Sequence, residues 1–519
     1  MIPDHADFSD MLARWATERP QADALVFGER RLSWAQLADR VHRLAGALRA
    51  SGLQPGERIA VLDLNHPSCL ELTLACAQIG TANAVVNFRL APPEIVYVIN
   101  DAKARLLFVG PEFAGAAAAV RAQLPSVERV IRVGGPEDEY EAWLDAQAPD
   151  TRVHPAARTD SFVQLYTSGT TGFPKGAMLT HGGMLAHARN VAAMQTMGGE
   201  SRVQVAMPLF HVGGTSYALV AWAGGAPIYL MRVPEPSAVL AMLERERITH
   251  TFYVPALMAA MAQVPGAADR DYSALQALAY GASPMPLPVM RACLKIFPGV
   301  MQQVYGMTEQ SGVVTVLGAE DHENPAVAHR LVSAGKAITG VEITVRDPAT
   351  GEPVPVGQPG EIWVRSEQVM GGYWGKPEAT TAAITVDGWY RSGDGGHLDA
   401  DGYVYVTDRI KDMIISGGEN IYPAEIERVL AEHPAIADVA VIGVPDERWG
   451  EVPRAVVVLR AGAQLDPDDL VAWCRERLAT YKCPKTADVV AELPCNPTGK
   501  ILKRALRKPY WAGRDRQVV

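Results

Sequence analysis

Residues 166–176 read Tyr166-Thr167-Ser168-Gly169-Thr170-Thr171-Gly172-Phe173-Pro174-Lys175-Gly176. The segment holds three threonines, one serine, three glycines and one lysine. Glycines let a backbone turn tightly and bring its N–H groups close to an anion. Hydroxyl groups add hydrogen-bond donors, and a lysine adds a mobile positive charge. The segment therefore predicts a loop that binds phosphate oxygens, and the apolar residues 162–166 predict a short strand that leads into it.

Two more ordinary explanations of a glycine-rich segment fit this loop less well. A flexible linker has no use for a fixed Pro174-Lys175-Gly176 ending. The Walker P-loop has the pattern Gly-x4-Gly-Lys-Ser/Thr. Here the fifth residue after Gly169 is Pro174, and Lys175 is followed by Gly176 instead of a hydroxyl residue. We therefore interpret the segment as a phosphate loop of a different kind.

Composition and charge restrict the class of protein. The chain has 519 residues, of which 48% are hydrophobic and 20% charged, and this indicates a folded protein with at least two domains. A formal net charge of -10 argues against a general nucleic-acid binder. The six cysteines are scattered without a Cys-x-x-Cys pair, so neither a zinc site nor a redox motif is indicated. Reduced thiols of this kind are typical of a cytoplasmic protein.

No segment predicts export or a membrane span. Residues 1–7 are acidic and lack the apolar core of a secretory signal. The longest apolar stretch, residues 216–231, is interrupted by Gly224, Gly225 and Pro227 and is too short to cross a bilayer. We interpret it as a buried helix followed by a strand, and we expect a cytoplasmic location. Peripheral contact with a membrane stays open.

Helices and strands are expected to alternate before the loop. A hairpin over residues 24–34 precedes a helix that begins at a capping box between Ser33 and Gln36. Further strands and helices are expected at 58–64, 70–79, 84–86, 93–100 and 106–109, and one plain surface helix at 114–124. This alternation predicts an α/β protein with a large, layered N-terminal domain and mostly parallel strands.

The last third of the chain differs from the earlier part in its residue composition and in the secondary structure that it predicts. Residues 335–365 carry many β-branched residues and turns, which predicts a β-rich subdomain. Residues 405–412 are densely charged, as at a domain boundary. The remainder predicts a small α+β domain, with helices at 423–432 and 466–478 and strands at 436–444 and 454–459. We place the N-terminal domain at 1–410 and the C-terminal domain at 411–519.

Two short motifs after the loop suit a ligand wall. Phe210-His211 precedes Gly213-Gly214, which remove side chains beside the histidine, although a lone histidine after an apolar run is more often a core residue. Gly281-Ala282-Ser283 ends a predicted strand at 278–280. Small residues at the carboxyl end of a strand leave room for a flat ligand, although the same residues also form ordinary tight turns.

Three further motifs carry polar groups suited to a nucleotide. Tyr305-Gly306-Met307-Thr308-Glu309 offers a ring, a hydroxyl and a carboxylate for a hard cation. Arg391-Ser392-Gly393-Asp394 offers a carboxylate that could accept hydrogen bonds from a ribose, or is merely a turn. Pro497-Thr498-Gly499-Lys500 near the end is an exposed turn or a basic, solvated tail.

These motifs occur together, between residues 162 and 504, in the order found in the adenylate-forming superfamily. The chain resembles an acyl-CoA synthetase of the fatty-acid type. The resemblance implies an acid–thiol ligase that uses ATP, Mg²⁺ and coenzyme A. A carboxylate attacks the α-phosphate of ATP and releases pyrophosphate; the thiolate of coenzyme A then attacks the acyl carbonyl and releases AMP. It also implies small-molecule substrates, no nucleic acid and, as a family expectation, a homodimer.

The resemblance carries residue roles over to this sequence. It implies catalytic roles for Lys500, His211 and Lys411 and a metal site at Thr167 and Glu309. Lys500 would neutralise charge that develops during adenylation, and Lys411 would be the hinge of a mobile C-terminal domain. The nucleotide and coenzyme A would contact Thr167, Ser168, Gly169, Thr170, Thr171, Gly172, Lys175, Gly281, Ala282, Ser283, Gln303, Tyr305, Gly306, Thr308, Asp394, Arg409, Ser416, Gly417 and Gly418.

The sequence leaves the acid open. Residues 213–216 are small, which favours a long or bulky acyl group, and we expect medium- to long-chain fatty acids. Some long-chain synthetases carry a tryptophan at the position of Thr215, which this chain lacks. Aromatic and alicyclic acids, and an acyl-AMP ligase that loads a carrier protein, are the alternatives. A non-catalytic sensor is disfavoured because Lys500, Glu309 and Lys411 are all present, and a luciferase-type oxygenase is a weaker alternative still.

Overall fold

The computed structural model describes residues 2–167, 174–283, 285–409, 412–416, 419–446, 449–478, 480–495 and 501–512. Two compact units divide the chain. The larger unit comprises residues 1–285, 289–342 and 364–390, and the smaller comprises 286–288, 343–363 and 391–519. Residues 410 and 411 lie outside the described ranges, so the boundary that we expect there stays a prediction.

A six-stranded sheet in the larger unit carries the predicted phosphate loop. Its order is β6-β5-β3-β4-β7-β8, and every neighbouring pair is parallel except the antiparallel pair β7–β8. Strands β3, β4 and β5 are buried along their whole length, as expected for the parallel part of a sheet covered on both faces. The strands are β3 (Arg58–Leu62), β4 (Ala82–Val85), β5 (Leu106–Val109), β6 (Arg129–Arg132), β7 (Ser161–Thr167) and β8 (Lys175–Thr180).

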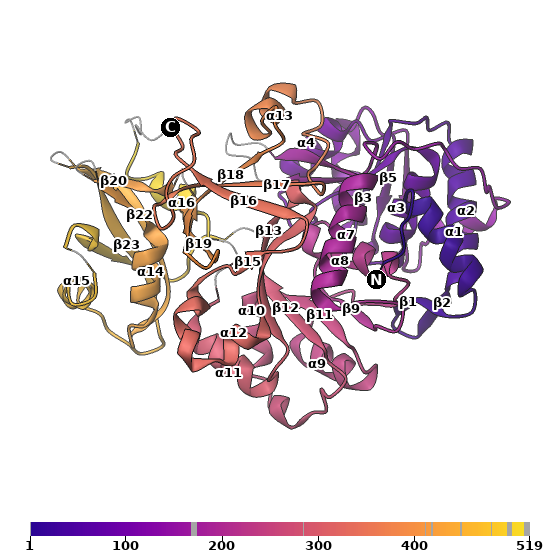
Figure 1. Cartoon of the computed structure of the whole chain (residues 1–519). Helices are drawn as coiled ribbons and strands as arrows, with labels where there is room; N and C mark the ends of the chain where they lie inside the picture. Colours follow the sequence, from indigo (N-terminus) through magenta and orange to yellow (C-terminus); the bar gives the residue numbers. More distant parts are fainter. Residues whose placement is uncertain are drawn as a thin grey trace. The chain divides into compact units, whose positions relative to one another are not determined.

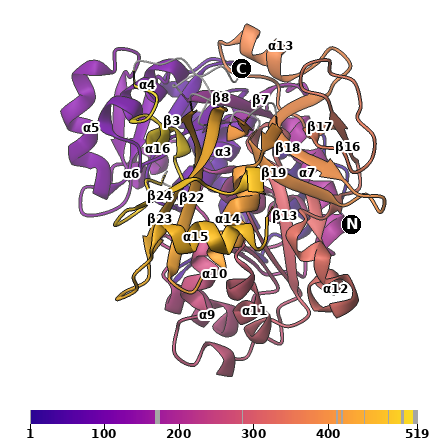
Figure 2. The same cartoon turned by 90° about the vertical axis from the view of Figure 1, so that its left-hand side faces the viewer.

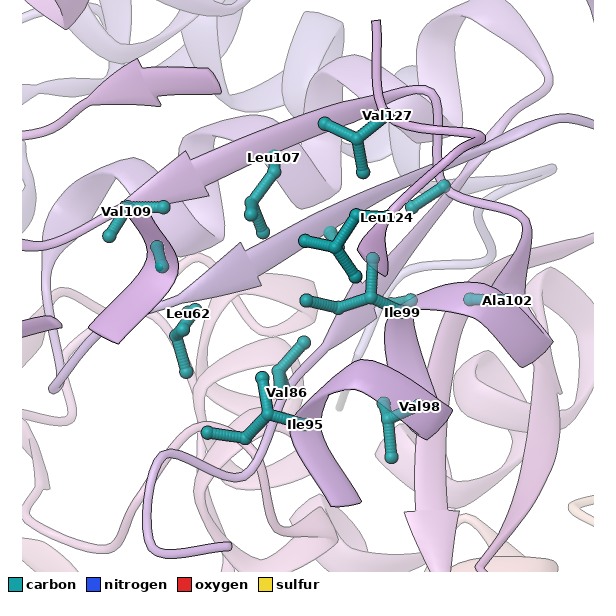
Figure 3. Close-up of a cluster of buried hydrophobic side chains, with 14 of the residues drawn as sticks. Leu62, Val86, Ile95, Val98, Ile99, Ala102, Leu107, Val109, Leu124 and Val127 are labelled. Carbon is teal, nitrogen blue, oxygen red and sulfur yellow. The ribbon is translucent and has the colours of Figure 1, made fainter. Parts of the chain in front are cut away.

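One apolar core lies on a face of this sheet. Figure 3 shows Ile95, Val98 and Ile99 of helix α4 (Pro92–Ala102) gathered with Leu62 and Leu107 of the strands. Helix α5 (Ala114–Val120) closes the same core through Ala117 and Val120. The expectation of one surface helix over 114–124 was wrong in its extent, because α5 ends at Val120 and a separate 3-10 turn follows at Arg121–Gln123.

A nine-stranded sheet forms the second layer of the larger unit, in the order β15-β14-β13-β12-β11-β9-β10-β1-β2. Its central pairs from β13 to β1 are parallel, and antiparallel strands complete both edges. The strands are β1 (Asp23–Phe27), β2 (Arg30–Ser33), β9 (Val203–Val205), β10 (Ile228–Leu230), β11 (His250–Tyr253), β12 (Ala277–Gly281), β13 (Met301–Met307), β14 (Gly312–Leu317) and β15 (Lys336–Ala337).

Helices pack beside these sheets. The capping box at Ser33 and Gln36 is present at the start of α2. Helices α7 and α8 pack side by side, and α8 also contacts β9 and β10 (Figure 1). The remaining helices of residues 1–390 are α1 (Phe8–Glu18), α2 (Trp34–Ala50), α3 (Pro67–Ile79), α6 (Tyr140–Asp145), α7 (His181–Gln195), α8 (Val212–Ala223), α9 (Pro236–Arg245), α10 (Pro255–Met261), α11 (Leu287–Ile296), α12 (Ala319–Glu323) and α13 (Pro377–Ala383).

The C-terminal part holds two further sheets. One has the order β16-β17-β18-β19, and the other joins β21-β20-β23-β22 with β24 beside β23. The strands are β16 (Val341–Arg346), β17 (Gly360–Ser366), β18 (Tyr390–Leu398), β19 (Val404–Arg409), β20 (Ile414–Ser416), β21 (Glu419–Ile421), β22 (Ile436–Asp446), β23 (Gly450–Leu459) and β24 (Thr486–Val489).

Helices cover both faces of the five-stranded sheet. Helices α14 (Pro423–Ala431) and α15 (Pro467–Arg475) lie beside one another along this sheet (Figure 2). They bury Ile426, Leu430 and Leu470 against one of its faces. The other face packs against Ile501 and the short helix α16 (Lys503–Arg507). The prediction of an α/β protein with a large N-terminal and a small C-terminal domain is thus confirmed.

Candidate active site

The two ends of the predicted phosphate loop lie opposite each other. Thr167 is the last residue of β7, Lys175 is the first of β8, and the two are register partners in the antiparallel pair. The predicted contacts Ser168, Gly169, Thr170, Thr171 and Gly172 lie outside the described residues. The strand pair therefore fixes where the chain leaves the sheet and where it returns.

A polar network anchors the strand that leads into the loop. The Tyr166 hydroxyl donates to Asp101 Oδ2 at 2.9 Å and accepts from Gln164 Nε2 at 2.9 Å. Arg58 donates to Gln164 Oε1 at 3.2 Å, and its guanidinium lies 3.3 Å from the ring centroid of Trp374. Burial lowers the pKa of Arg58 to about 10, so the guanidinium stays charged at neutral pH. These contacts hold the residue directly before Thr167.

Glu309 is brought to the loop from a distant part of the sequence. It lies in a 3-10 turn (Thr308–Gln310) between β13 and β14, and the residue is 8% exposed. Its Oε1 accepts the Thr167 hydroxyl at 3.2 Å and the Tyr373 hydroxyl at 2.9 Å. Thr167 and Glu309, which the sequence assigned to one metal site, are therefore direct neighbours. Thr308, the predicted phosphate contact, begins the same turn.

The carboxyl ends of β12 and β13 form a second wall. A Cβ at Gly281 would lie 2.1 Å from the carbonyl oxygen of Val304, so only glycine fits against β13. Ala282 follows with a φ of 69°, a left-handed conformation that costs a non-glycine residue about 1–2 kcal/mol. Such strained residues concentrate at functional sites. The other predicted members of this wall are Ser283, directly after Ala282, and Gln303, Tyr305 and Gly306 of β13.

His211 begins helix α8 and is neutral. Burial, reinforced by the charge of Arg89, lowers the pKa of His211 to about 3. Its Nε2 is buried and has no hydrogen-bond partner among the described residues, and its ring lies 4.2 Å from that of Phe210. A buried polar atom without a partner is costly, and a ligand that bonds it would remove that cost. The imidazole can therefore orient a ligand without carrying charge.

A side-chain clamp that the sequence did not reveal holds the segment before His211. Asn65 Nδ2 donates to the carbonyl oxygen of Met207 at 3.0 Å, and the Leu209 N–H donates to Asn65 Oδ1 at 2.9 Å. The Thr215 hydroxyl donates to the carbonyl oxygen of Leu209 from the other side. Asn65 is 3% exposed. The turn that carries His211 is thus fixed by buried hydrogen bonds.

An ion pair with a buried carboxylate lies next to this clamp. Asp63 and Arg232 pair at 2.9 Å, and Arg232 also bonds Glu112. Burial raises the pKa of Asp63 to about 6, although Arg232 opposes the shift. A Cβ at Gly110 would meet Asp63 Oδ1 at 1.8 Å, so glycine is required there as well.

The remaining predicted residues belong to the smaller unit. Asp394 of β18 is buried and is the register partner of Arg409 at the end of β19. The side chain of Arg409 and residues Lys411, Gly417, Gly418 and Lys500 lie outside the description. Ser416 ends β20. Cys495 and Ile501, which flank the Lys500 segment, form an antiparallel bridge.

Tyr373 is the residue at the Glu309 junction that the sequence reasoning missed. The Gly371-Gly372-Tyr373-Trp374 segment was the available signal, because paired glycines before two aromatic residues are typical of a tightly packed turn. Its partner Glu309 is 64 residues away in the sequence, so no local pattern indicates the contact.

Family profiles place this chain in a known class. The AMP-binding enzyme profile matches residues 12–374, and the profile of the AMP-binding enzyme C-terminal domain matches residues 425–500. The crystal structure of ATP-bound MatB from Rhodopseudomonas palustris aligns with a TM-score of 0.89 at 28% identity, over 98% of this chain and 99% of that chain. The chain belongs to the AMP-binding enzyme family, within the adenylate-forming superfamily.

Curated relatives cover nearly the whole chain. A feruloyl-CoA synthase from an Amycolatopsis species is 42% identical over 96% of this chain and 99% of its own length. A fatty acid–[acyl-carrier-protein] ligase from Streptomyces coeruleorubidus is 35% identical over 97% and 96%. The chain is therefore an ATP-binding enzyme of the acid–thiol ligase class. Among the residues that the structure describes, no helix is both long and apolar enough to cross a membrane.

Proposed function

We propose that this enzyme joins an aromatic carboxylic acid of the arylpropenoate type to coenzyme A through an acyl-adenylate. The acid carboxylate attacks the α-phosphate of ATP and pyrophosphate leaves; the coenzyme A thiolate attacks the acyl carbonyl and AMP leaves. The observation that best supports an adenylation reaction is the pair of hydrogen bonds that join Thr167 and Tyr373 to Glu309, beside the start of the predicted phosphate loop. It joins the strand pair of the loop to the turn after β13.

Magnesium fits this junction. Mg²⁺ is held by one or two carboxylates together with substrate phosphates, so a dedicated cluster is not needed. No group of three or more His, Cys, Asp or Glu side chains gathers in the described ranges. Glu309 and Thr167 would hold the cation, which would supply positive charge to offset the charge of the phosphate oxygens. Lys175 would add positive charge from the other end of the loop.

The choice of an aromatic acid rests on the surroundings of His211 and on the relative with 42% identity. A Cβ at Gly213 would lie 2.7 Å from Cε1 of Phe252, so the space beside this glycine is taken by an aromatic ring. Phe252 is near the carboxyl end of β11, next to β12, which ends in the Gly281 wall. In parallel sheets ligands bind at that edge. A flat aromatic acid suits a site walled by Phe252 and the neutral His211.

Packing accounts for the other small residues that had favoured a long acyl group. A Cβ at Gly214 would meet the Pro208 carbonyl oxygen at 2.3 Å. The hydroxyls of Thr215 and Ser216 bond back to the carbonyl oxygens of Leu209 and Val212. Small side chains at 213–216 are therefore no argument for a long chain. Medium- to long-chain fatty acids remain the second candidate, supported by the fatty-acid relative.

The test is AMP release and thioester formation with ferulate, 4-coumarate, benzoate, octanoate and palmitate. We expect turnover with the two arylpropenoates and little with palmitate. The Phe252→Leu variant should lose roughly tenfold or more in kcat/KM for ferulate while its KM for ATP stays constant. Phe297→Leu, which alters a buried core ring, is the matched control and should leave specificity unchanged.

Each alternative has its own signature in this assay. Preferred turnover of octanoate or palmitate would assign the enzyme to fatty acids. Pyrophosphate release without any thioester would indicate a carrier protein as acceptor, in place of coenzyme A. Absence of ATP-dependent AMP or pyrophosphate formation with all five acids would contradict the proposed substrates.

A further inference from the structure

The Tyr373 hydroxyl shares one carboxylate oxygen with Thr167. Tyr373 donates to Glu309 Oε1 at 2.9 Å and Thr167 donates to the same atom at 3.2 Å. Tyr373 and Glu309 are each 8% exposed. Among the described residues no donor bonds Oε2 of Glu309. Two hydroxyls thus hold Oε1, so that the carboxylate can present its second oxygen to a ligand.

The backbone of Tyr373 is fixed by the strand that ends the phosphate loop. The Gly371 N–H donates to the Met178 carbonyl oxygen at 2.8 Å, and the Met178 N–H donates to that of Gly372 at 2.9 Å. The Trp374 N–H donates to the Gly176 carbonyl oxygen at 2.8 Å. Gly372 has a φ of 116°, which only glycine adopts readily. Tyr373 is therefore held against β8 on both sides.

The same ring also faces the loop lysine. Lys175 Nζ lies 5.0 Å from the ring centroid of Tyr373, within the range of a cation–π contact. Tyr373 thus touches both groups that bring opposite charges to the phosphate loop, the carboxylate of Glu309 and the ammonium of Lys175. A ring with these two contacts can set the distance between the carboxylate and the loop.

We propose that Tyr373 is a positioning residue that turns Glu309 so that Oε2 faces the divalent cation of the nucleotide complex. The inference rests on the proposed function, because it takes Glu309 as the metal carboxylate. Groups that hydrogen-bond a metal-ligating side chain typically change metal affinity by roughly 10–100-fold when removed. Loss of the hydroxyl alone leaves the ring and its packing in place.

The experiment measures metal binding directly. Mn²⁺ is titrated into wild-type protein with α,β-methylene-ATP, and bound metal is followed by electron paramagnetic resonance. We expect Tyr373→Phe to weaken Mn²⁺ binding about tenfold or more, while binding of the analogue without metal, measured by calorimetry, is unchanged. Tyr272→Phe removes a comparable hydroxyl bond, to the Ala267 carbonyl oxygen at 2.9 Å, and should behave as wild type.

A Glu309→Ala variant tests the metal-binding role of Glu309 separately from the positioning role of Tyr373. If Glu309→Ala loses Mn²⁺ affinity and Tyr373→Phe does not, Tyr373 only packs the site and the inference is wrong, while the metal assignment stands. If Glu309→Ala keeps full Mn²⁺ affinity, Glu309 is not the metal carboxylate, and the proposed role of Tyr373 is then wrong as well. Equal weakening of metal-bound and metal-free nucleotide in Tyr373→Phe would indicate general damage and would also overturn the inference.

Discussion

Replacing Asn65 with alanine should destabilise the protein through the clamp on the turn before His211. The substitution removes the partners of the Met207 carbonyl oxygen and the Leu209 N–H, at 3.0 and 2.9 Å. A buried donor or acceptor left without its partner costs about 1–3 kcal/mol. Asn65 is 3% exposed, so water does not readily replace the amide. We expect the free energy of unfolding to fall by about 2–6 kcal/mol.

The assay is urea unfolding followed by tryptophan fluorescence, with the KM values for the acid and for ATP measured on the same variant. Because the clamp holds the turn that carries His211, the KM for the acid should rise more than that for ATP. Asn87→Ala is the matched control: Asn87 accepts one bond at an exposed turn, from the Arg89 N–H at 3.0 Å, and should cost less than about 1 kcal/mol. If Asn65→Ala lowers the free energy of unfolding by no more than Asn87→Ala does, the reasoning is refuted.

Two further predictions concern pH and the adenylation step. Asp63 has a pKa of about 6 in the folded protein against an ordinary 3.8, so the folded state binds its proton more tightly and stability falls as pH rises from about 4 to 6. Asp63→Asn should remove up to about 3 kcal/mol of that pH dependence, and parallel stability–pH curves for wild type and variant would contradict this. Lys500→Ala should slow adenylation by roughly 10²–10³ yet spare thioester formation from supplied acyl-adenylate. Equal loss of both half-reactions, measured separately, would exclude the assigned role.

Local patterns predicted much of the fold. The hairpin and the capping box at Ser33, the strand into the phosphate loop and the elements around α14 and β22 follow from turn residues and apolar periodicity. Residues 114–124 were predicted less well, because an alanine-rich run has high helix propensity at every position, while the break after Val120 depends on packing against the six-stranded sheet.

The sequence by itself determined the chemistry of this protein. The hydroxyl, carboxylate and lysine groups of the motifs between residues 162 and 504, in their order along the chain, resemble those of the adenylate-forming superfamily, to which the family profile also assigns the chain. Only the tertiary structure decided how those groups are held. Tyr373 meets Glu309 across 64 residues, and Asn65 meets the turn before His211 across 142. Gly213 is small because of Phe252. Such contacts join residues that are far apart in the sequence, and apolar periodicity shows which face of an element is buried but not which residue it meets.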